Sequence, residues 1–211
     1  MRRIVTSTYD REFWEQLWRR TLHEHAGGAL RPPSAHLTHE VSSLSPGRAL
    51  DAGCGHGSDT LWLAAHGWKV CAVDFSAAAL AHGRDMAEAA GPEIADRVDW
   101  VEADLATWAP QPGHFDLVVS LYVHVAGSMQ EMVSRLGAGV APGGTLLAVG
   151  HRPIDPASGA PTPAAGQQQV SVQSAVAALD TDQWHVVVAD DRPRPAAGSG
   201  VDAVIRARRL L

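Results

Sequence analysis

The chain has 211 residues, 45% of them hydrophobic, and a formal net charge of −6 at pH 7. This length and apolar content suit a single domain over residues 1–211, and the negative charge argues against a nucleic-acid binder, which needs a basic face. No apolar run approaches the roughly 20 residues that span a bilayer, and no apolar signal core follows residue 1, so we expect a cytoplasmic protein without a membrane partner. Cys54 and Cys71, the two cysteines, lack the spacing of a disulfide framework or a metal site.

The first 46 residues are predicted to form an N-terminal helical cap. A capping-box spacing precedes a helix expected to run to about residue 25, with Trp14 and Trp18 on its apolar face. We interpret Trp14 as packing on the domain and Trp18 as also closing a ligand pocket. A Gly- and Pro-rich loop and a short helix over 34–44 follow.

From residue 48 the sequence alternates strand and helix patterns, which is typical of a parallel sheet covered on both faces. Five strands are predicted, over 48–51, 69–73, 98–102, 117–123 and 145–149. Three helices are predicted between them, over 58–66 and 76–90 and from 128 to the turn at 142–144. The region 47–151 is therefore the predicted core.

The C-terminal part of the sequence has a different pattern. Residues 152–169 are rich in Pro, Ala, Gly and Gln, and we expect a mobile lid loop there. A helix over 171–179 and strands over 184–189 and 201–208 follow, so residues 170–211 are predicted to form a helix and an antiparallel hairpin.

A glycine-rich loop follows the first strand. Its residues are Asp51-Ala52-Gly53-Cys54-Gly55-His56-Gly57, and a helix is predicted from Ser58. Glycines let a ligand approach the backbone closely, and a helix N-terminus presents free N–H groups. The loop is therefore expected to bind a nucleotide-like cofactor.

Two further acids follow the second and third strands, at Asp74 and Asp104. The carboxyl ends of parallel strands meet at one edge of a sheet, where ligands of open α/β sheets bind. There Asp74 is placed to accept two ribose hydroxyls and Asp104 to accept an amino group. With Asp51, these acids outline an adenosine site.

Five segments in this order resemble the class I S-adenosylmethionine-dependent methyltransferases. They are residues 49–57, 72–76, 102–105, 115–120 and 136–150, the last of which includes a turn at 141–145. The resemblance implies a three-layer Rossmann-like fold with a seven-stranded, mostly parallel sheet and an antiparallel last strand. Residues 9–15 and 149–151 look like the small bacterial tellurite-resistance and thiopurine methyltransferases.

The resemblance also implies which residues bind S-adenosylmethionine. Gly53 and Gly55 would admit the methionine part, Asp74 would hold the ribose, and an aromatic at Trp18 would lie over the cofactor. The remaining residues expected around the cofactor are Asp51, Cys54, Gly57, Phe75, Asp104, Leu105 and Ser120. S-adenosylhomocysteine would be the product.

The main alternative among nucleotide binders is a nicotinamide or flavin dehydrogenase, whose loop has the pattern GxGxxG. Here the third glycine, Gly57, comes one residue earlier. Asp51, Asp104 and the turn at 142–144 are also not expected in a dehydrogenase, so the methyltransferase is favoured. A second alternative is a cofactor-binding protein without transfer activity, in a regulatory or complex-forming role.

His124 and His151 follow the fourth and fifth strands and are our candidates for a catalytic base, because an imidazole accepts protons near neutral pH. The alternative for each is a hydrogen-bonded loop histidine. No cluster of residues predicts a metal site. We expect a small-molecule acceptor with an O, N or S nucleophile, whereas the sequence leaves the acceptor and the oligomeric state open.

Overall fold

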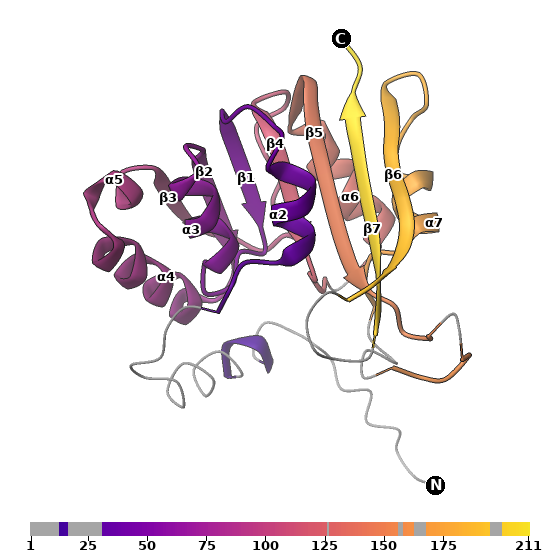
Figure 1. Cartoon of the computed structure of the whole chain (residues 1–211), viewed down its shortest axis with the longest axis horizontal. Helices are drawn as coiled ribbons and strands as arrows, with labels where there is room; N and C mark the ends of the chain where they lie inside the picture. The colour runs from indigo at the N-terminus through magenta and orange to yellow at the C-terminus, as the bar shows by residue number, and fades with distance from the viewer. Residues whose placement is uncertain (1–12, 17–30, 126, 156–157, 163–167, 195–199) are drawn as a thin grey trace, which may run out of the picture.

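The computed structural model describes residues 13–16, 31–125, 127–155, 158–162, 168–194 and 200–211. These residues include seven strands, which form one sheet in the order β3-β2-β1-β4-β5-β7-β6 (Figure 1). Strands β1 to β5 pair in parallel, whereas β7 is antiparallel to β5 and β6, which confirms the predicted sheet. In chain order the strands are Arg48–Ala52 (β1), Lys69–Asp74 (β2), Val98–Glu102 (β3), Phe115–Leu121 (β4), Val140–His151 (β5), Trp184–Pro193 (β6) and Val201–Arg209 (β7).

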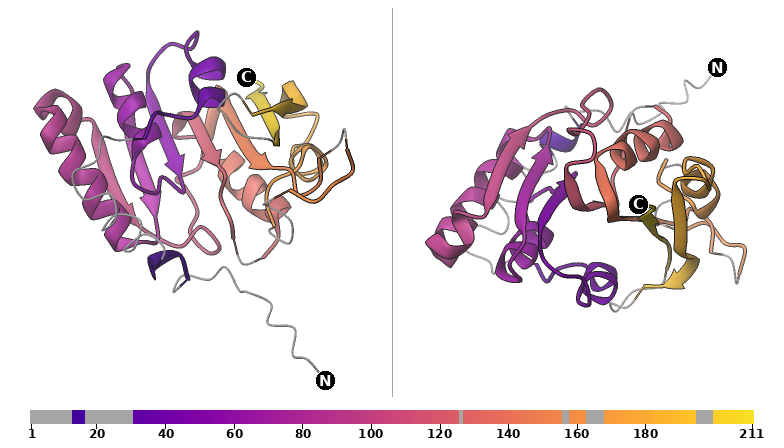
Figure 2. Two further views of the ribbon diagram at one scale, coloured as in Figure 1. Left: turned by 60° about the horizontal axis from the view of Figure 1, so that its bottom comes forward. Right: turned by 90° about the horizontal axis from the view of Figure 1, so that it is seen from above.

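Helices cover both faces of the sheet (Figure 2). Side chains of the central strand β4 alternate between two hydrophobic cores, with Leu117 and Val119 in one and Val118 in the other. This alternation within an unbroken apolar run is what burial on both faces requires. The first core is covered by α2 (Ala35–Val41), α3 (Ser58–Ala65), α4 (Ala77–Ala90) and α5 (Pro92–Ala95), and the second by α6 (Met129–Ala138) and α7 (Val172–Ala177).

The structure corrects several predicted boundaries. β5 begins at Val140 because the turn at 142–144 forms a bulge within the strand instead of preceding it. β4 ends at Leu121, since Tyr122 has a left-handed φ of 59° that interrupts the extended backbone. β6 continues to Pro193, so the hairpin strands are longer than predicted.

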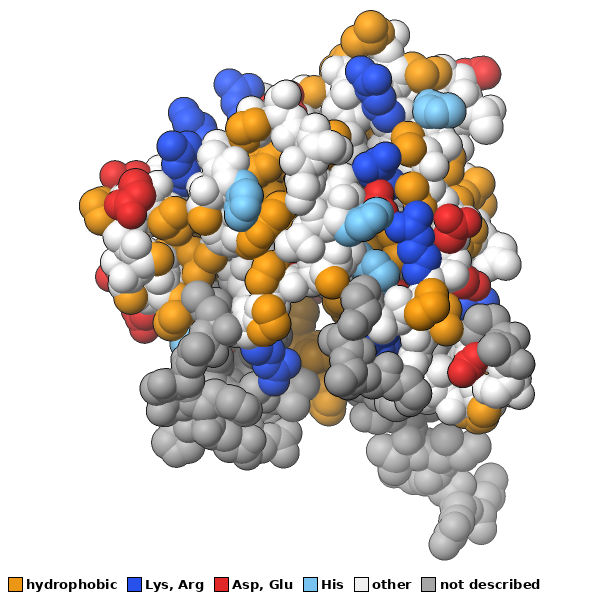
Figure 3. All heavy atoms as spheres, in the orientation of Figure 1, with side chains coloured by type: hydrophobic (Ala, Val, Ile, Leu, Met, Phe, Trp, Pro, Cys, Tyr) orange, Lys and Arg blue, Asp and Glu red, His pale blue; other side chains and the backbone are white. Residues whose placement is uncertain are grey.

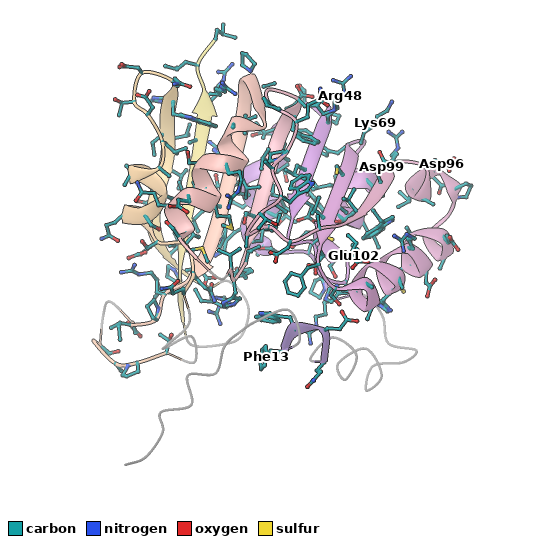
Figure 4. All side chains as sticks on the ribbon, turned by 180° about the vertical axis from the view of Figure 1, so that it is seen from behind. Phe13, Arg48, Lys69, Asp96, Asp99 and Glu102 are labelled. Atoms are coloured by element: carbon teal, nitrogen blue, oxygen red, sulfur yellow. The ribbon has the colours of Figure 1, made fainter. Side chains whose placement is uncertain are left out.

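The carboxyl ends of the parallel strands meet at one edge of the sheet. Arg48 and Lys69, where β1 and β2 begin, lie at the opposite edge from Glu102, where β3 ends (Figure 4). The helical segment at residues 13–16 carries Phe13 and lies beyond the Glu102 edge (Figure 4). The remainder of the helix predicted to reach about residue 25, with Trp18, falls outside the described residues.

Candidate functional site

The glycine loop follows β1 and is attached to the end of β2. The Gly53 and Cys54 N–H groups both donate to the Val73 carbonyl, at 2.8 and 3.1 Å. Gly53, Gly55 and Gly57 have φ values of 84°, 52° and 88°, a region that favours glycine. A Cβ atom on Gly53 would lie 2.4 Å from Val123 Cγ2, so the segment after β4 packs directly against this loop.

Asp74, the last residue of β2, organises the loop through its carboxylate. Its Oδ2 accepts from the Gly55 N–H and its Oδ1 from the Ser76 N–H, both at 2.9 Å. Burial raises the pKa of Asp74, and hydrogen bonds from the backbone N–H groups of Ser76, Gly55 and Phe75 oppose that effect. A carboxylate has about four acceptor positions, so these contacts leave acceptor capacity on Asp74 for a ligand.

Asp51 is buried at the end of β1, where Thr60 Oγ1 donates to its Oδ2 at 2.6 Å. Burial, with the negative charges of Asp59 and Asp74, raises the pKa of Asp51 to about 7. Burial and the Asp51 charge also raise the pKa of the Cys54 thiol, which argues against a nucleophilic role for this cysteine. The loop is thus short of positive charge.

The other residues predicted around the cofactor lie near the same edge of the sheet. Phe75 follows β2 and is half-buried, and Ser120 is buried on β4 one residue before the strand ends. Leu105 is buried in the second core, whereas Asp104 is exposed and its Oδ1 accepts from the Ala106 N–H at 2.8 Å. Asp104 therefore caps its own turn.

The two candidate histidines come together at the ends of β4 and β5. The side chain of Gln169 connects them: its Oε1 accepts from the His151 N–H at 2.5 Å, and its Nε2 lies 3.1 Å from His124 Nε2. Since the amide nitrogen can only donate, His124 Nε2 is the acceptor in this contact. Burial, with the neighbouring His151, lowers the pKa of His124 to about 4, so His124 is neutral at pH 7.

The N-terminal segment at residues 13–16 contacts both halves of this edge. Glu15 Oε2 accepts from Ser76 Oγ at 2.5 Å, beside Asp74, and the Trp14 ring lies 5.0 Å from the His124 ring between centroids. Trp14 was predicted to pack on the domain, and the structure adds a contact with a candidate catalytic residue.

Sequence reasoning missed Asp202, which is fully buried and 2.8 Å from His151 Nδ1. One signal was present in the sequence: Asp202 interrupts the apolar run at 201–205, where a strand was predicted. A lone carboxylate in a buried strand needs partners, and they come from segments far away in the chain.

Charged and histidine side chains gather over β7 and β6 on the face that carries α2 (Figure 3). Glu40 of α2 is buried, and its carboxylate lies 2.5 Å from Arg192 Nη1 on β6 and 3.2 Å from Arg206 Nη1 on β7. These ion pairs attach α2 to the antiparallel end of the sheet.

The described residues contain neither a metal-binding cluster nor a membrane-spanning helix. Within the described residues, no group of three or more His, Cys, Asp or Glu side chains is arranged to hold a metal ion. None of the helices in the described ranges is long and apolar enough to cross a membrane.

Residues 49–144 fit a family model described as a methyltransferase domain. Trans-aconitate 2-methyltransferase from Paracidovorax citrulli is 35% identical over 118 residues, which cover 54% of this chain and 42% of that protein. Thiocyanate methyltransferase 1 from Arabidopsis thaliana is 32% identical over 129 residues, which cover 61% of this chain and 55% of that protein. The chain thus spans about half the length of these curated relatives.

Solved structures of similar fold extend further along the chain. The [4+2]-cyclase SpnF has a TM-score of 0.74 at 16% identity, with 95% of each chain covered. An S-adenosylmethionine-dependent methyltransferase from Mesorhizobium loti has a TM-score of 0.65 at 19% identity, with 82% of this chain and 95% of that chain covered. At these identities the likeness establishes the fold.

Proposed function

We propose that the chain is a class I S-adenosylmethionine-dependent methyltransferase that transfers a methyl group from S-adenosylmethionine to a small molecule, as its match to a methyltransferase-domain family model and its methyltransferase relatives support. The observation that carries this proposal is the Asp74 carboxylate beside the glycine loop. Its remaining acceptor capacity suits the hydroxyls of a ribose.

The described residues divide the work of binding the cofactor. Asp74 accepts hydrogen bonds from the ribose, while Phe75, Asp104, Leu105 and Ser120 border the adenine. Gly53 and Gly55, with Cys54 and Gly57, would hold the methionine part, and the carboxylate of Asp51 would complement its positive charge. Trp18 stays a prediction. The bound cofactor supplies an electrophilic methyl group on a sulfonium, and the protein aligns the acceptor with that group.

The acceptor side of the site contains the two histidines. His124 is neutral at pH 7, so it adds no positive charge beside the sulfonium, and its Nε2 is already engaged by Gln169. These contacts favour His151 over His124 as the base for an acceptor that carries a proton. The segment 152–169 borders this side through Gln169, although residues 156–157 and 163–167 lie outside the described part.

Three broader features complete the proposal. We place the protein in the cytoplasm, in keeping with two free cysteines. The acceptor is a small molecule rather than a nucleic acid, in keeping with the net charge of −6. Trans-aconitate and thiocyanate appear in the names of relatives, and both are small anions that belong in an acceptor screen.

The test measures conversion of S-adenosylmethionine to S-adenosylhomocysteine with a panel of thiols, phenols, amines and carboxylates. Calorimetry with the cofactor alone is run in parallel. We expect binding and turnover of at least one acceptor class, and loss of both in Asp74→Ala. Binding without any turnover would favour the cofactor-binding protein without transfer activity, and absence of binding would refute the proposal.

A further inference from the structure

The carboxylate of Asp202 is the centre of a hydrogen-bond network next to the candidate histidines. Its Oδ1 lies 2.8 Å from His151 Nδ1 and 3.1 Å from Arg194 Nη2. Its Oδ2 accepts from Tyr122 Oη at 3.0 Å and lies 3.3 Å from His36 Nε2. Since a carboxylate has about four acceptor positions, these four donors satisfy it completely. Burial alone would raise the pKa of Asp202, yet hydrogen bonds from His151, His36 and Arg194, with the charge of Arg194, hold it well below the usual range.

Two features fix the imidazole of His151 against this carboxylate. The antiparallel register of β5 and β7 sets His151 directly opposite Asp202. The ring of Tyr122 stacks on the imidazole, with centroids 4.3 Å apart and 29° between the planes. The left-handed φ of 59° at Tyr122 is costly for a bulky side chain, and such strain persists where surrounding contacts hold the residue.

The same network selects one tautomer of His151. Its Nδ1 either donates to Asp202 or accepts from Arg194 Nη2, which lies 2.7 Å away. Arg194 already has Asp202 Oδ1 as an acceptor, whereas the buried carboxylate would lose a charge-assisted hydrogen bond if Nδ1 were unprotonated. The proton therefore belongs on Nδ1, which leaves the lone pair on Nε2. In the described part of the chain, no hydrogen bond engages Nε2.

From this geometry we infer that Asp202 positions His151 as the general base of methyl transfer, and that the acceptor atom carries a proton at neutral pH, as in a phenol or a thiol. The inference rests on the proposed function and adds the chemical class of the acceptor. A carboxylate acceptor is already ionised at pH 7 and needs no base, whereas a phenol is almost fully protonated there.

The transfer step balances in charge and protons. A lone pair of the acceptor atom forms the bond to the methyl carbon while the sulfur–carbon bond breaks and leaves its electron pair on sulfur. The acceptor's proton moves to His151 Nε2, so one positive charge leaves the sulfonium and one appears on the imidazole. Asp202 stabilises that imidazolium, as a buried carboxylate does in hydrolase triads. The other charged or titratable groups around it are Arg194, Tyr122, His36 and His124.

The test compares Asp202→Asn with a matched control, Asp190→Asn, which makes the same change on the neighbouring strand β6, where Asp190 is exposed. The probes are phenol and 4-nitrophenol at pH 8, since the nitro compound is largely ionised there and phenol is not. In Asp202→Asn we expect kcat for phenol to fall by at least about 100-fold, and for 4-nitrophenol by no more than about threefold. Calorimetry with the cofactor should give an unchanged Kd.

Three outcomes separate the possibilities. Equal losses of kcat for both phenols would overturn the role of Asp202, as a purely structural residue would affect both alike. Methylation confined to carboxylates or thiocyanate would overturn the acceptor class. Absence of turnover by the wild-type protein with every acceptor would instead overturn the proposed function.

If Asp202→Asn does not fold, a measurement on the wild-type protein still tests the inference. Nitrogen-15 NMR distinguishes a protonated from an unprotonated ring nitrogen, and the His151 signals are assigned by their loss in His151→Gln. We expect Nδ1 to be protonated in the neutral ring. An unprotonated Nδ1, which would accept from Arg194, would overturn the inference.

Discussion

Replacement of Asp74 by Asn should weaken cofactor binding while it leaves the fold intact. Each carboxylate oxygen of Asp74 accepts one backbone N–H at 2.9 Å, and each is assigned one ribose hydroxyl in our proposal. An amide keeps one oxygen acceptor but presents an NH₂ group where the other oxygen was, so one ribose hydrogen bond and one loop hydrogen bond are lost. A hydrogen bond to a charged group contributes about 1.5–3 kcal/mol. Loss of the ribose bond alone should therefore raise Kd about 10- to 150-fold.

The assay is isothermal titration calorimetry with S-adenosylhomocysteine, together with thermal unfolding. The control is Asp99→Asn, which removes the same charge from an exposed position on the adjacent strand β3 and should leave Kd unchanged. A Kd for Asp74→Asn within twofold of the wild-type value would refute the assignment of the ribose to Asp74. If Asp74→Asn and Asp99→Asn weaken binding equally, the loss of negative charge at long range would explain both changes.

Three further predictions concern the loop and the sheet. The pKa of Asp51 is raised to about 7, so Asp51 should release a proton when the cationic cofactor binds beside it. Affinity should then fall by up to about tenfold from pH 8 to pH 6, and calorimetry of Asp51→Asn should show no such slope. Gly57→Ala should weaken binding more than Gly113→Ala, since both have positive φ but a Cβ at Gly57 would lie 2.7 Å from Trp100. Glu40→Gln should lower the free energy of unfolding in urea by about 1–3 kcal/mol, because Arg192 and Arg206 lose the buried negative charge that they pair with. The Kd for the cofactor should stay constant.

The half of the site around the glycine loop could be predicted because its information is local. The loop, Asp51 and Asp74 lie within two consecutive strand–helix units, and parallel strands bring their carboxyl ends to one edge whatever the exact register. Asp104 shows the limit of that argument. Its position after β3 was foreseen, but its side chain caps a local turn, and only the neighbouring contacts decide such a choice.

The half around His151 depends on long-range register and could not be predicted. His151 and Asp202 are opposite each other only because β5 and β7 pair in one antiparallel register, and a shift by one residue would turn Asp202 to the other face. The left-handed backbone of Tyr122 is set by tertiary contacts, so its stacking on His151 has no local signal in the sequence. Gln169 lies in a stretch without periodicity, so its contact with both histidines had no signal in the sequence.

The two halves of the edge differ in how their carboxylates are satisfied, and this difference fits the separate roles that we propose for them. Asp202 has four donors, so it keeps its charge without any ligand and can orient His151 before the acceptor arrives. Asp51 has one hydroxyl donor and two neighbouring acids, so its ionised form is disfavoured until a cation is brought to it. A preorganised anion suits a group that must position a base. An anion that awaits its counter-charge suits a group that recognises a cationic methyl donor, and Val123, which packs on Gly53 beside His124, joins the two.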